Sequence, residues 1–202
     1  MSYGFLDIAI TPSVKAAQAK MGTAAIWERD HQRESDRFSE DEIAFIGERD
    51  SFYMATVSET GWPYMQHRGG PKGFLKVLDD KTLAFADFRG NRQYLSLGNI
   101  GANDRACLFL MDYPHRARLK IYVHVEEFVD ADLAKRVTVE GYKAKVERVL
   151  RMRLEAFDWN CPQHITPRFT PDELSPLRDR LEQLETENAA LEARLAGAGS
   201  SH

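Results

Sequence analysis

Apolar and polar residues alternate along much of the middle of the chain, and this period of two predicts β-strands. Leu119–Phe128 shows the clearest alternation, and Arg148–Phe157 repeats it, with Leu150 and Met152 on one face. Five further short runs are bounded by turn residues: Ser51–Ser58, Trp62–Arg68, Gly73–Leu78, Thr82–Ala86 and Ala106–Met111. Seven strands at this density, with few helices between them, predict a mainly β protein with helices (α+β), built as a six- to seven-stranded antiparallel barrel that is closed or split.

The run Ala106–Met111 is apolar at nearly every position. This composition is typical of a strand in a sheet that is covered on both faces. We therefore expect Cys107, which lies within the run, to be a buried small hydrophobic residue.

Helix signals occur before and between the strand runs. Ser39 and Glu42 form a capping-box pattern ahead of an apolar stretch, which predicts that a helix begins there. Two helical insertions fit the pattern at Asn91–Asn99 and Asp132–Tyr142, with Asn91 as a candidate N-cap of the first.

Leucines recur near the C-terminus at spacings of three and four residues, as at positions a and d of a coiled-coil heptad repeat. Asn188 takes one a position, where a lone asparagine fixes the register of two strands. Ser175 and Pro176 predict the N-cap and first position of this helix, and Gly197 predicts its end. The stripe either pairs with another chain or packs on its own domain, and both alternatives stay open. The heptad residues are Leu174, Leu181, Asn188 and Leu195 at a, and Leu177, Leu184 and Leu191 at d.

These signals divide the chain into three segments. Residues 1–38 are helix-prone and rich in charge, which predicts a solvated helical extension. Residues 39–169 hold the strand runs and predict the barrel domain. Residues 170–202 hold the leucine repeat and predict a C-terminal helix that can form a coiled coil.

Composition narrows the functional classes. The chain has 202 residues, 43% of them hydrophobic and 29% charged, which is ordinary for a globular protein. Its 27 basic and 31 acidic residues give a net charge of −4, which argues against a general nucleic-acid binder. No apolar run approaches the roughly 18 residues of a membrane-spanning helix, and the N-terminus has no basic signal region, so we expect a cytoplasmic protein without a membrane partner.

Cysteine and histidine usage predicts no metal centre. Two cysteines, Cys107 and Cys161, do not suffice for a disulfide framework or a four-ligand zinc site. The six histidines lack a metal-ligand spacing such as H-E-x-x-H.

The stretch Asp87–Arg92 is the first candidate binding site. It follows a strand run and combines a glycine with two arginines, Arg89 and Arg92, ahead of a predicted helix that Asn91 caps. The unpaired N–H groups at a helix N-terminus, flanked by guanidinium groups, form a phosphate site. The alternative is a strand-to-helix turn whose arginines are solvated.

The stretch Gln66–Pro71 is the second candidate. Its glycines permit a close approach of the backbone to a flat ligand, and Arg68 can pair with a phosphate or an electron-rich ring edge. The alternative is a tight turn whose polar side chains face water. Both stretches follow strand ends of a small barrel, where a pocket commonly forms.

These motifs together resemble the pyridoxamine 5′-phosphate oxidase-like flavoproteins, in particular a bacterial branch of flavin-nucleotide-binding proteins. Their order and spacing carry the resemblance, which covers about half of the chain from Phe52 to Met111 and extends to Trp159–Ile165. The motifs are W-P-Y-M-Q-H-R-G-G-P-K-G-F, V-L-D-D-K-T-L-A-F-A-D-F-R-G-N-R, R-A-C-L-F-L and W-N-C-P-Q-H-I. The resemblance implies an FMN-binding split barrel and a homodimer with two FMN sites at the subunit interface.

The resemblance also implies which residues hold FMN. Asp87 faces the flavin, and Asn91 and Arg92 hold the phosphate. Gln93 stands where the oxidases have a lysine, so Arg68, Arg89 and Arg92 carry more of the phosphate binding. The residues expected along the flavin and its ribityl chain are Gln66, His67, Arg68 and Gly69.

The segment Trp159–His164 is expected to close over the flavin. Trp159 would stack on the ring, and Gln163 or His164 would reach the substrate as candidate catalytic residues. The alternative is that Trp159 is a core aromatic residue and His164 a surface residue.

The resemblance implies an FMN-dependent oxidoreductase acting on a small substrate. Activity on vitamin B6 phosphates is not expected, because the chain continues into Arg168–Thr170 and the leucine repeat where the oxidases have basic, histidine-containing motifs. No nucleophile motif of the G-x-S-x-G kind is present, which argues against a hydrolase. The alternatives are a flavin-binding or sensing dimer without turnover, and the same barrel holding a deazaflavin or haem.

Overall fold

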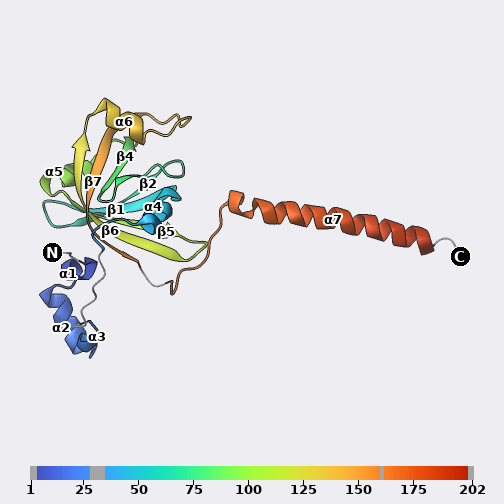
Figure 1. Ribbon diagram of the computed structural model, residues 1–202, viewed down its shortest axis with the longest axis horizontal. Coiled ribbons are helices and arrows are strands. Elements are labelled where there is room, and N and C mark those ends of the chain that lie inside the picture. Colours follow the sequence, from blue (N-terminus) through green and yellow to red (C-terminus); the bar gives the residue numbers. More distant parts are fainter. Residues whose placement is uncertain (1–3, 28–34, 160–161, 200–202) are drawn as a thin grey trace. The chain divides into compact units, whose positions relative to one another are not determined.

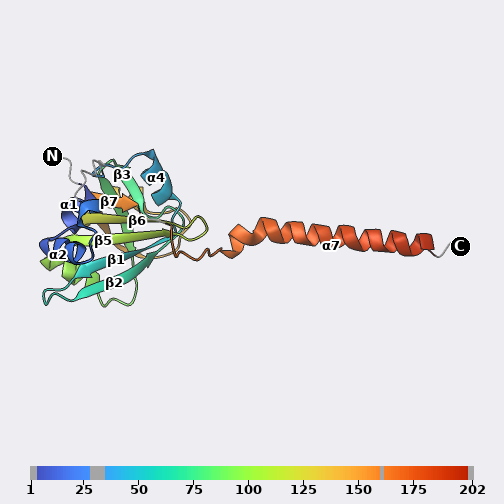
Figure 2. The ribbon, with the colours of Figure 1, turned by 90° about the horizontal axis from the view of Figure 1, so that it is seen from below.

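Seven antiparallel strands form one sheet in the computed structural model, which describes residues 4–27, 35–159 and 162–199. The sheet order is β2-β1-β5-β6-β7-β4-β3, and Figure 2 shows β6, β5, β1 and β2 side by side. Together with its helices, this sheet confirms the predicted α+β antiparallel barrel. The strands are β1 (Ser51–Val57), β2 (Pro63–Gly69), β3 (Lys76–Asp79), β4 (Thr82–Phe88), β5 (Arg105–Asp112), β6 (Ala117–Phe128) and β7 (Val146–Trp159).

The sheet curls until strands that are distant in its order face each other across the core (Figure 1). Three strands separate β1 from β4 in the sheet, yet the rings of Phe52 on β1 and Phe85 on β4 lie 5.4 Å apart. Phe74, in the segment before β3, stacks on Phe52 at 5.6 Å. No pairing joins β2 to β3. The result is a barrel that is split along one side.

The helices are short, with one exception. No helix in the described ranges is long and apolar enough to cross a membrane. The helix α6 covers a small second core formed by Ala84, Ala86, Val137 and Val149. The helices are α1 (Phe5–Ala9), α2 (Pro12–Lys20), α3 (Ala24–Trp27), α4 (Glu40–Gly47), α5 (Leu95–Ala102), α6 (Ala131–Val137) and α7 (Pro171–Gly199).

The chain divides into two units, each described here by itself. The first comprises Met1–Asp112 and Ala117–Gln163 and contains the barrel. The second comprises Tyr113–Arg116 and His164–His202 and contains α7.

The expectation that a helix begins at Asn91 was wrong. The side chain of Asn91 accepts a hydrogen bond from the Gln93 backbone N–H at 3.1 Å, which forms a local turn in place of a cap. Arg92 and Tyr94 then adopt left-handed backbone conformations, with φ of 60° and 52°. A helix cannot continue through such residues, so α5 begins at Leu95.

Two other boundaries also differ from prediction. The run predicted from Gly73 becomes a strand only at Lys76, because Gly73 has φ +72° and Phe74 donates to the carbonyl of Pro71 in a turn. The helix α6 ends at Val137, five residues earlier than predicted, since Thr138 is extended.

The boundaries of α7 were wrong at both ends. Thr170 and Glu173 exchange hydrogen bonds as a capping box, so the helix begins at Pro171 and not beside Ser175. Pro176 therefore lies inside the helix, which continues past Gly197 to its last residue, Gly199.

The strand β5 is buried on one face only. Ala106, Leu108 and Leu110 point into the core, whereas Cys107 and the other residues of the opposite face are half-buried. The expectation that Cys107 is buried was therefore wrong, because the described chain leaves the outer face of the sheet partly uncovered. The outer face of β5 is nonetheless largely apolar.

Glu42 joins α4 to the end of β7. One carboxylate oxygen accepts hydrogen bonds from the backbone N–H and the hydroxyl of Ser39, at 2.9 and 2.6 Å, as the predicted capping box requires. The other accepts from Trp159 Nε1 at 2.6 Å, and Phe45 packs edge-on against the indole. Burial opposes ionisation of Glu42, but the hydrogen bonds from Ser39 and Trp159 outweigh it and lower its pKa.

We expect Glu42→Gln to lower the free energy of unfolding by about 1–3 kcal/mol at neutral pH, because it weakens charge-assisted hydrogen bonds in a buried position. The folded-state pKa lies below the ordinary value of 4.5. The stabilisation by the carboxylate is therefore present above 4.5 and is lost as the pH falls through the folded pKa. Urea denaturation at neutral pH and near pH 4 measures this, and the difference from the parent chain shrinks at the lower pH.

Glu40→Gln is the matched control, since Glu40 lies exposed in the same helical turn. Its effect stays within about 0.5 kcal/mol. A Glu42→Gln effect that grows toward acid pH would contradict the assignment.

Candidate functional site

A buried ion pair closes the barrel at its split. The side chains of β2 alternate, so Gln66 and Arg68 share the half-buried face. Arg68 Nη1 lies 2.6 Å from Asp87 Oδ1 on β4, and both side chains are at most 14% exposed. The Arg68 guanidinium also lies over the ring of Phe85, 5.7 Å from its centroid. The two candidate stretches of the sequence therefore meet, at Arg68 and Asp87.

A second guanidinium, from Arg148 on β7, approaches the same carboxylate. Its Nη1 lies 3.5 Å from Asp87 Oδ2, and its Nε lies 3.0 Å from Glu127 Oε1. Arg148 was not among the site residues predicted from the sequence. Its place in the alternating run could have indicated it, because it lies two and four residues before the core residues Leu150 and Met152 and so belongs to the same face of the strand.

Burial weakens ionisation of both partners of the ion pair. It raises the pKa of Asp87, and the guanidinium groups of Arg68 and Arg148 only partly oppose this effect. Burial likewise lowers the pKa of Arg68, with Asp87 acting in the opposite direction. Arg68 thus pairs with Asp87 in a poorly solvated place, whereas Arg148 also pairs with Glu127 and Glu147.

The loop between β4 and α5 adjoins this cluster. Arg89 Nε lies 3.2 Å from Glu147 Oε1, and the hydroxyl of Tyr94 donates to Glu147 Oε2 at 3.1 Å. Asn91 and Arg92 are exposed. The left-handed conformations of Arg92 and Tyr94 cost energy, and such residues concentrate at functional sites.

The first turn of α5 is open to a ligand. Its N-cap residue, Tyr94, provides no side-chain hydrogen bond. A hollow of about 380 Å³ lies beside this turn, between Gln93–Leu95 and the β1–β2 turn at Ser58–Thr60. Ser96 Oγ donates to Gln66 Oε1 at 2.8 Å and so links α5 to β2.

His67 and Gly69 lie on the opposite face of β2 from Arg68. His67 is exposed and packs edge-on against Tyr53 at 5.6 Å. At the neighbouring Gly70, a Cβ atom would lie 2.8 Å from the Phe74 ring, so the close approach that this glycine permits is to Phe74.

Trp159 lies at the other end of β7 from Arg148. The eleven residue-to-residue steps between them correspond to about 35 Å of strand. Its indole is half-buried, bonded to Glu42 and packed against the main core. Gln163 and His164 are exposed, and His164 belongs to the second unit, with φ 63°. The chain therefore does not bring its own Trp159 to its own arginine cluster.

The donors of the cluster fit an anionic, oxygen-rich ligand. Arg68 Nε and Arg118 Nε are the two buried side-chain nitrogen or oxygen atoms without a hydrogen-bond partner among the described residues. An unpaired buried donor is costly, and an acceptor oxygen from a ligand would satisfy Arg68 Nε. The described ranges contain no group of three acidic, histidine or cysteine side chains that would hold a metal ion.

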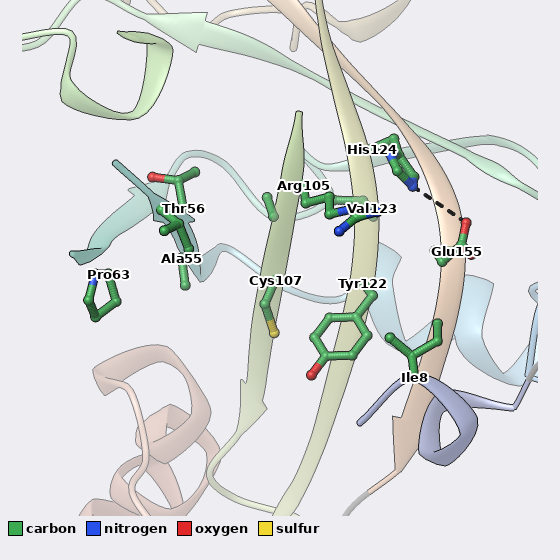
Figure 3. Close-up of a pocket in the computed structure, with 12 residues that line it drawn as sticks. Ile8, Ala55, Thr56, Pro63, Arg105, Cys107, Tyr122, Val123, His124 and Glu155 are labelled. Atoms are coloured by element: carbon green, nitrogen blue, oxygen red, sulfur yellow. Dashed lines mark ion pairs between the residues drawn. The ribbon is translucent and has the colours of Figure 1, made fainter. Parts of the chain in front are cut away.

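An apolar groove of about 480 Å³ runs along the outer face of β1, β5 and β6 (Figure 3). Cys107 and Tyr122 line it from neighbouring strands, with Ile8 of α1 on one side and Pro63 on the other. His124 at its edge contacts Asp104 at 2.8 Å and Glu155 at 3.5 Å. Burial raises the pKa of the Cys107 thiol, which keeps it protonated and unreactive.

A family model described as pyridoxamine 5′-phosphate oxidase matches residues 39–160, more than half of the chain. No curated protein matches the sequence.

The solved structures that are similar to this chain differ widely from it in sequence. HupZ from Group A Streptococcus has a TM-score of 0.50 and 15% identity, covering 65% of this chain and 100% of HupZ. An FMN-binding protein from Syntrophomonas wolfei has a TM-score of 0.47 and 11% identity, covering 72% and 97%. A Clostridium acetobutylicum protein related to general stress protein 26 has a TM-score of 0.44 and 15% identity, covering 66% and 94%. At these identities the likeness to HupZ shows the fold alone.

We expect Asp87→Asn to lower the free energy of unfolding by about 3 kcal/mol or more, because it leaves two buried guanidinium groups without their carboxylate. Adding Arg68→Met to this variant costs less than Arg68→Met alone, with a coupling of at least about 1 kcal/mol. Urea denaturation of the four chains measures the cycle.

Glu126→Gln is the matched control, since Glu126 pairs with Arg151 across strands in an exposed place. Its effect stays below about 1 kcal/mol. Additive effects of the two cluster substitutions would show that the pair does not hold the barrel closed.

Proposed function

Because the chain belongs to the pyridoxamine 5′-phosphate oxidase family, we propose that it is an FMN-dependent oxidoreductase acting on a small substrate. The observation that carries the proposal is Arg68 Nε, a buried donor without a hydrogen-bond partner among the described residues. Asp87 pairs with Arg68 Nη1, so the remaining N–H groups of this guanidinium favour an anionic or oxygen-rich ligand.

The phosphate of FMN is assigned to the first turn of α5 and the loop before it. The open N–H groups at this helix terminus favour an anion, and the exposed Arg92 supplies a charged donor. Asn91 lies beside it, and Arg89 contributes from its pair with Glu147. The hollow beside Tyr94 leaves room for the group.

The flavin ring and the ribityl chain are assigned to the half-buried face of β2. Gln66 and Arg68 present amide and guanidinium donors there, and Asp87 fixes the Arg68 guanidinium. His67 and Gly69 lie on the opposite face of the strand, so only their backbone groups are assigned to this site. When bound, FMN supplies the hydride or electron transfer, and a nearby cation such as Arg68 favours its reduced, anionic form.

A second copy of the chain is assigned to the outer face of β1, β2 and β5. This face exposes Tyr53, Val57 and Met65 around the groove at Cys107. A contiguous exposed apolar surface of this kind marks an interaction site, and its coverage accounts for the two apolar faces of β5. Trp159 lies far from the arginine cluster of its own chain, so its proposed role at the flavin needs a site shared between two chains. In a dimer, Trp159, Gln163 and His164 would act at the site of the other chain.

We expect Arg92→Ala to weaken FMN binding by roughly 10- to 150-fold, the equivalent of one lost charge-assisted hydrogen bond of 1.5–3 kcal/mol. Quenching of FMN fluorescence on titration with the protein measures the affinity. Arg92 is exposed, so the fold is preserved, and Arg153→Ala, a change at another exposed arginine, leaves the affinity unchanged.

Two results would contradict the cofactor assignment: a purified protein that does not bind added FMN, or one with the visible spectrum of haem. Reduction of the bound flavin by NAD(P)H, with reoxidation in air, distinguishes an oxidoreductase from a flavin-binding protein without turnover. Bound FMN that no electron donor reduces would support a flavin-binding protein without turnover.

We expect the barrel to dimerise without the leucine repeat. A chain ending at Leu174 remains a dimer in sedimentation velocity, and Ala55→Glu converts it to a monomer, because Ala55 lies between Met65 and Cys107 on the outer face. Lys143→Glu, in an exposed loop, leaves the dimer intact and controls for added charge. If the chain ending at Leu174 were monomeric without Ala55→Glu, dimerisation would be assigned to another surface.

A further inference from the structure

The helix α7 presents a continuous leucine stripe to solvent. It has 29 residues and is about 43 Å long. Six leucines lie on the a and d positions of three heptads, and each is at least 39% exposed. Exposed leucines in this pattern are typical of a helix that pairs with another helix. The stripe comprises Leu174, Leu177, Leu181, Leu184, Leu191 and Leu195.

We propose that α7 pairs with α7 of a second copy of this chain as a parallel, in-register, two-stranded coiled coil. Asn188, at an a position, identifies the occupant and the direction. In a parallel pair in register, Asn188 lies opposite Asn188 of the second copy, and the two amides bond to each other. An antiparallel pair places a positions opposite d positions, so the amide meets a leucine and loses its partner.

The charges that flank the stripe are complementary in the same arrangement. In a parallel pair, each g residue lies beside the e residue of the next heptad in the other chain. Glu173 then meets Arg178, and Arg180 meets Glu185, so both contacts join opposite charges. The third contact, Glu187 with Glu192, joins like charges. Arg180 of the same chain lies 3.8 Å from Glu187 and reduces this repulsion.

This pairing is independent of the proposed cofactor and adds a second contact to the proposed barrel dimer. Three heptads are marginal by themselves, and a barrel contact that raises the local concentration of the helices favours their pairing. Its test must therefore distinguish a coiled coil from two helices that are only tethered close together.

The test is disulfide trapping in the full-length chain with Cys107 and Cys161 replaced by serine. Leu191→Cys puts a thiol at a d position, which faces its copy in a parallel pair within the 7 Å or so between Cα atoms that a disulfide allows. Ala193→Cys, two residues further on, puts a thiol at an f position, which points away from the partner. In a glutathione redox buffer, we expect the first chain to migrate as a linked dimer on a non-reducing gel, and the second to remain unlinked.

Adding Leu181→Glu and Leu184→Glu to the Leu191→Cys chain abolishes the link, because it buries charges in the seam. Far-UV circular dichroism of each variant confirms that the barrel is folded. Absence of a link at position 191, as expected if the stripe packs on its own domain or pairs antiparallel, overturns the proposal. Equal linking at positions 191 and 193 overturns it too, since it shows proximity without a seam. Neither result depends on FMN.

Discussion

The ion pair between Arg68 and Asp87 is the contact on which the architecture and the candidate site both depend. Hydrogen bonding holds the sheet together from β2 through to β3 but leaves the two edges of the split unpaired. Arg68 and Asp87 join strands on either side of that split. Moving charged groups out of water costs free energy, and a single ion pair recovers only part of that cost. Arg148 adds attraction to Asp87 and also pairs with Glu127 and Glu147. The contact that closes the barrel also leaves Arg68 Nε without a partner among the described residues, and the proposed ligand site depends on this donor.

The two faces of β5 also have different partners. The inward face is filled by Leu108 and Leu110, and the outward face exposes Cys107 and the groove beside Tyr122. An apolar outer face does not stabilise a monomer, because water still contacts it. A second chain that covers this face removes the apolar surface from water, which stabilises the dimer. The proposed shared site follows from this, since Trp159 lies about 35 Å along β7 from Arg148 and would reach an arginine cluster in a second chain.

The sequence predicted the elements better than their ends. Period-two alternation, apolar runs and turn residues together located all seven strands. Helix ends depend on local competition that the pattern does not contain. Asn91 bonds to its own backbone rather than capping a helix, and the Thr170 capping box starts α7 ahead of Pro176. The partners in the site were less predictable, since the register that brings Arg148 to Asp87 is set by pairing between strands distant in sequence. The sequence indicated this contact only through the charge of Arg148 at a strand position that faces the core.

Symmetry limits how the two proposed contacts combine. Each joins identical surfaces of two chains, so each has its own two-fold axis. If the axes differed, every chain would bind one neighbour through the barrel and another through α7, and the assembly would grow without closing. A closed assembly of two chains therefore requires that the barrel contact and the α7 contact share one common axis.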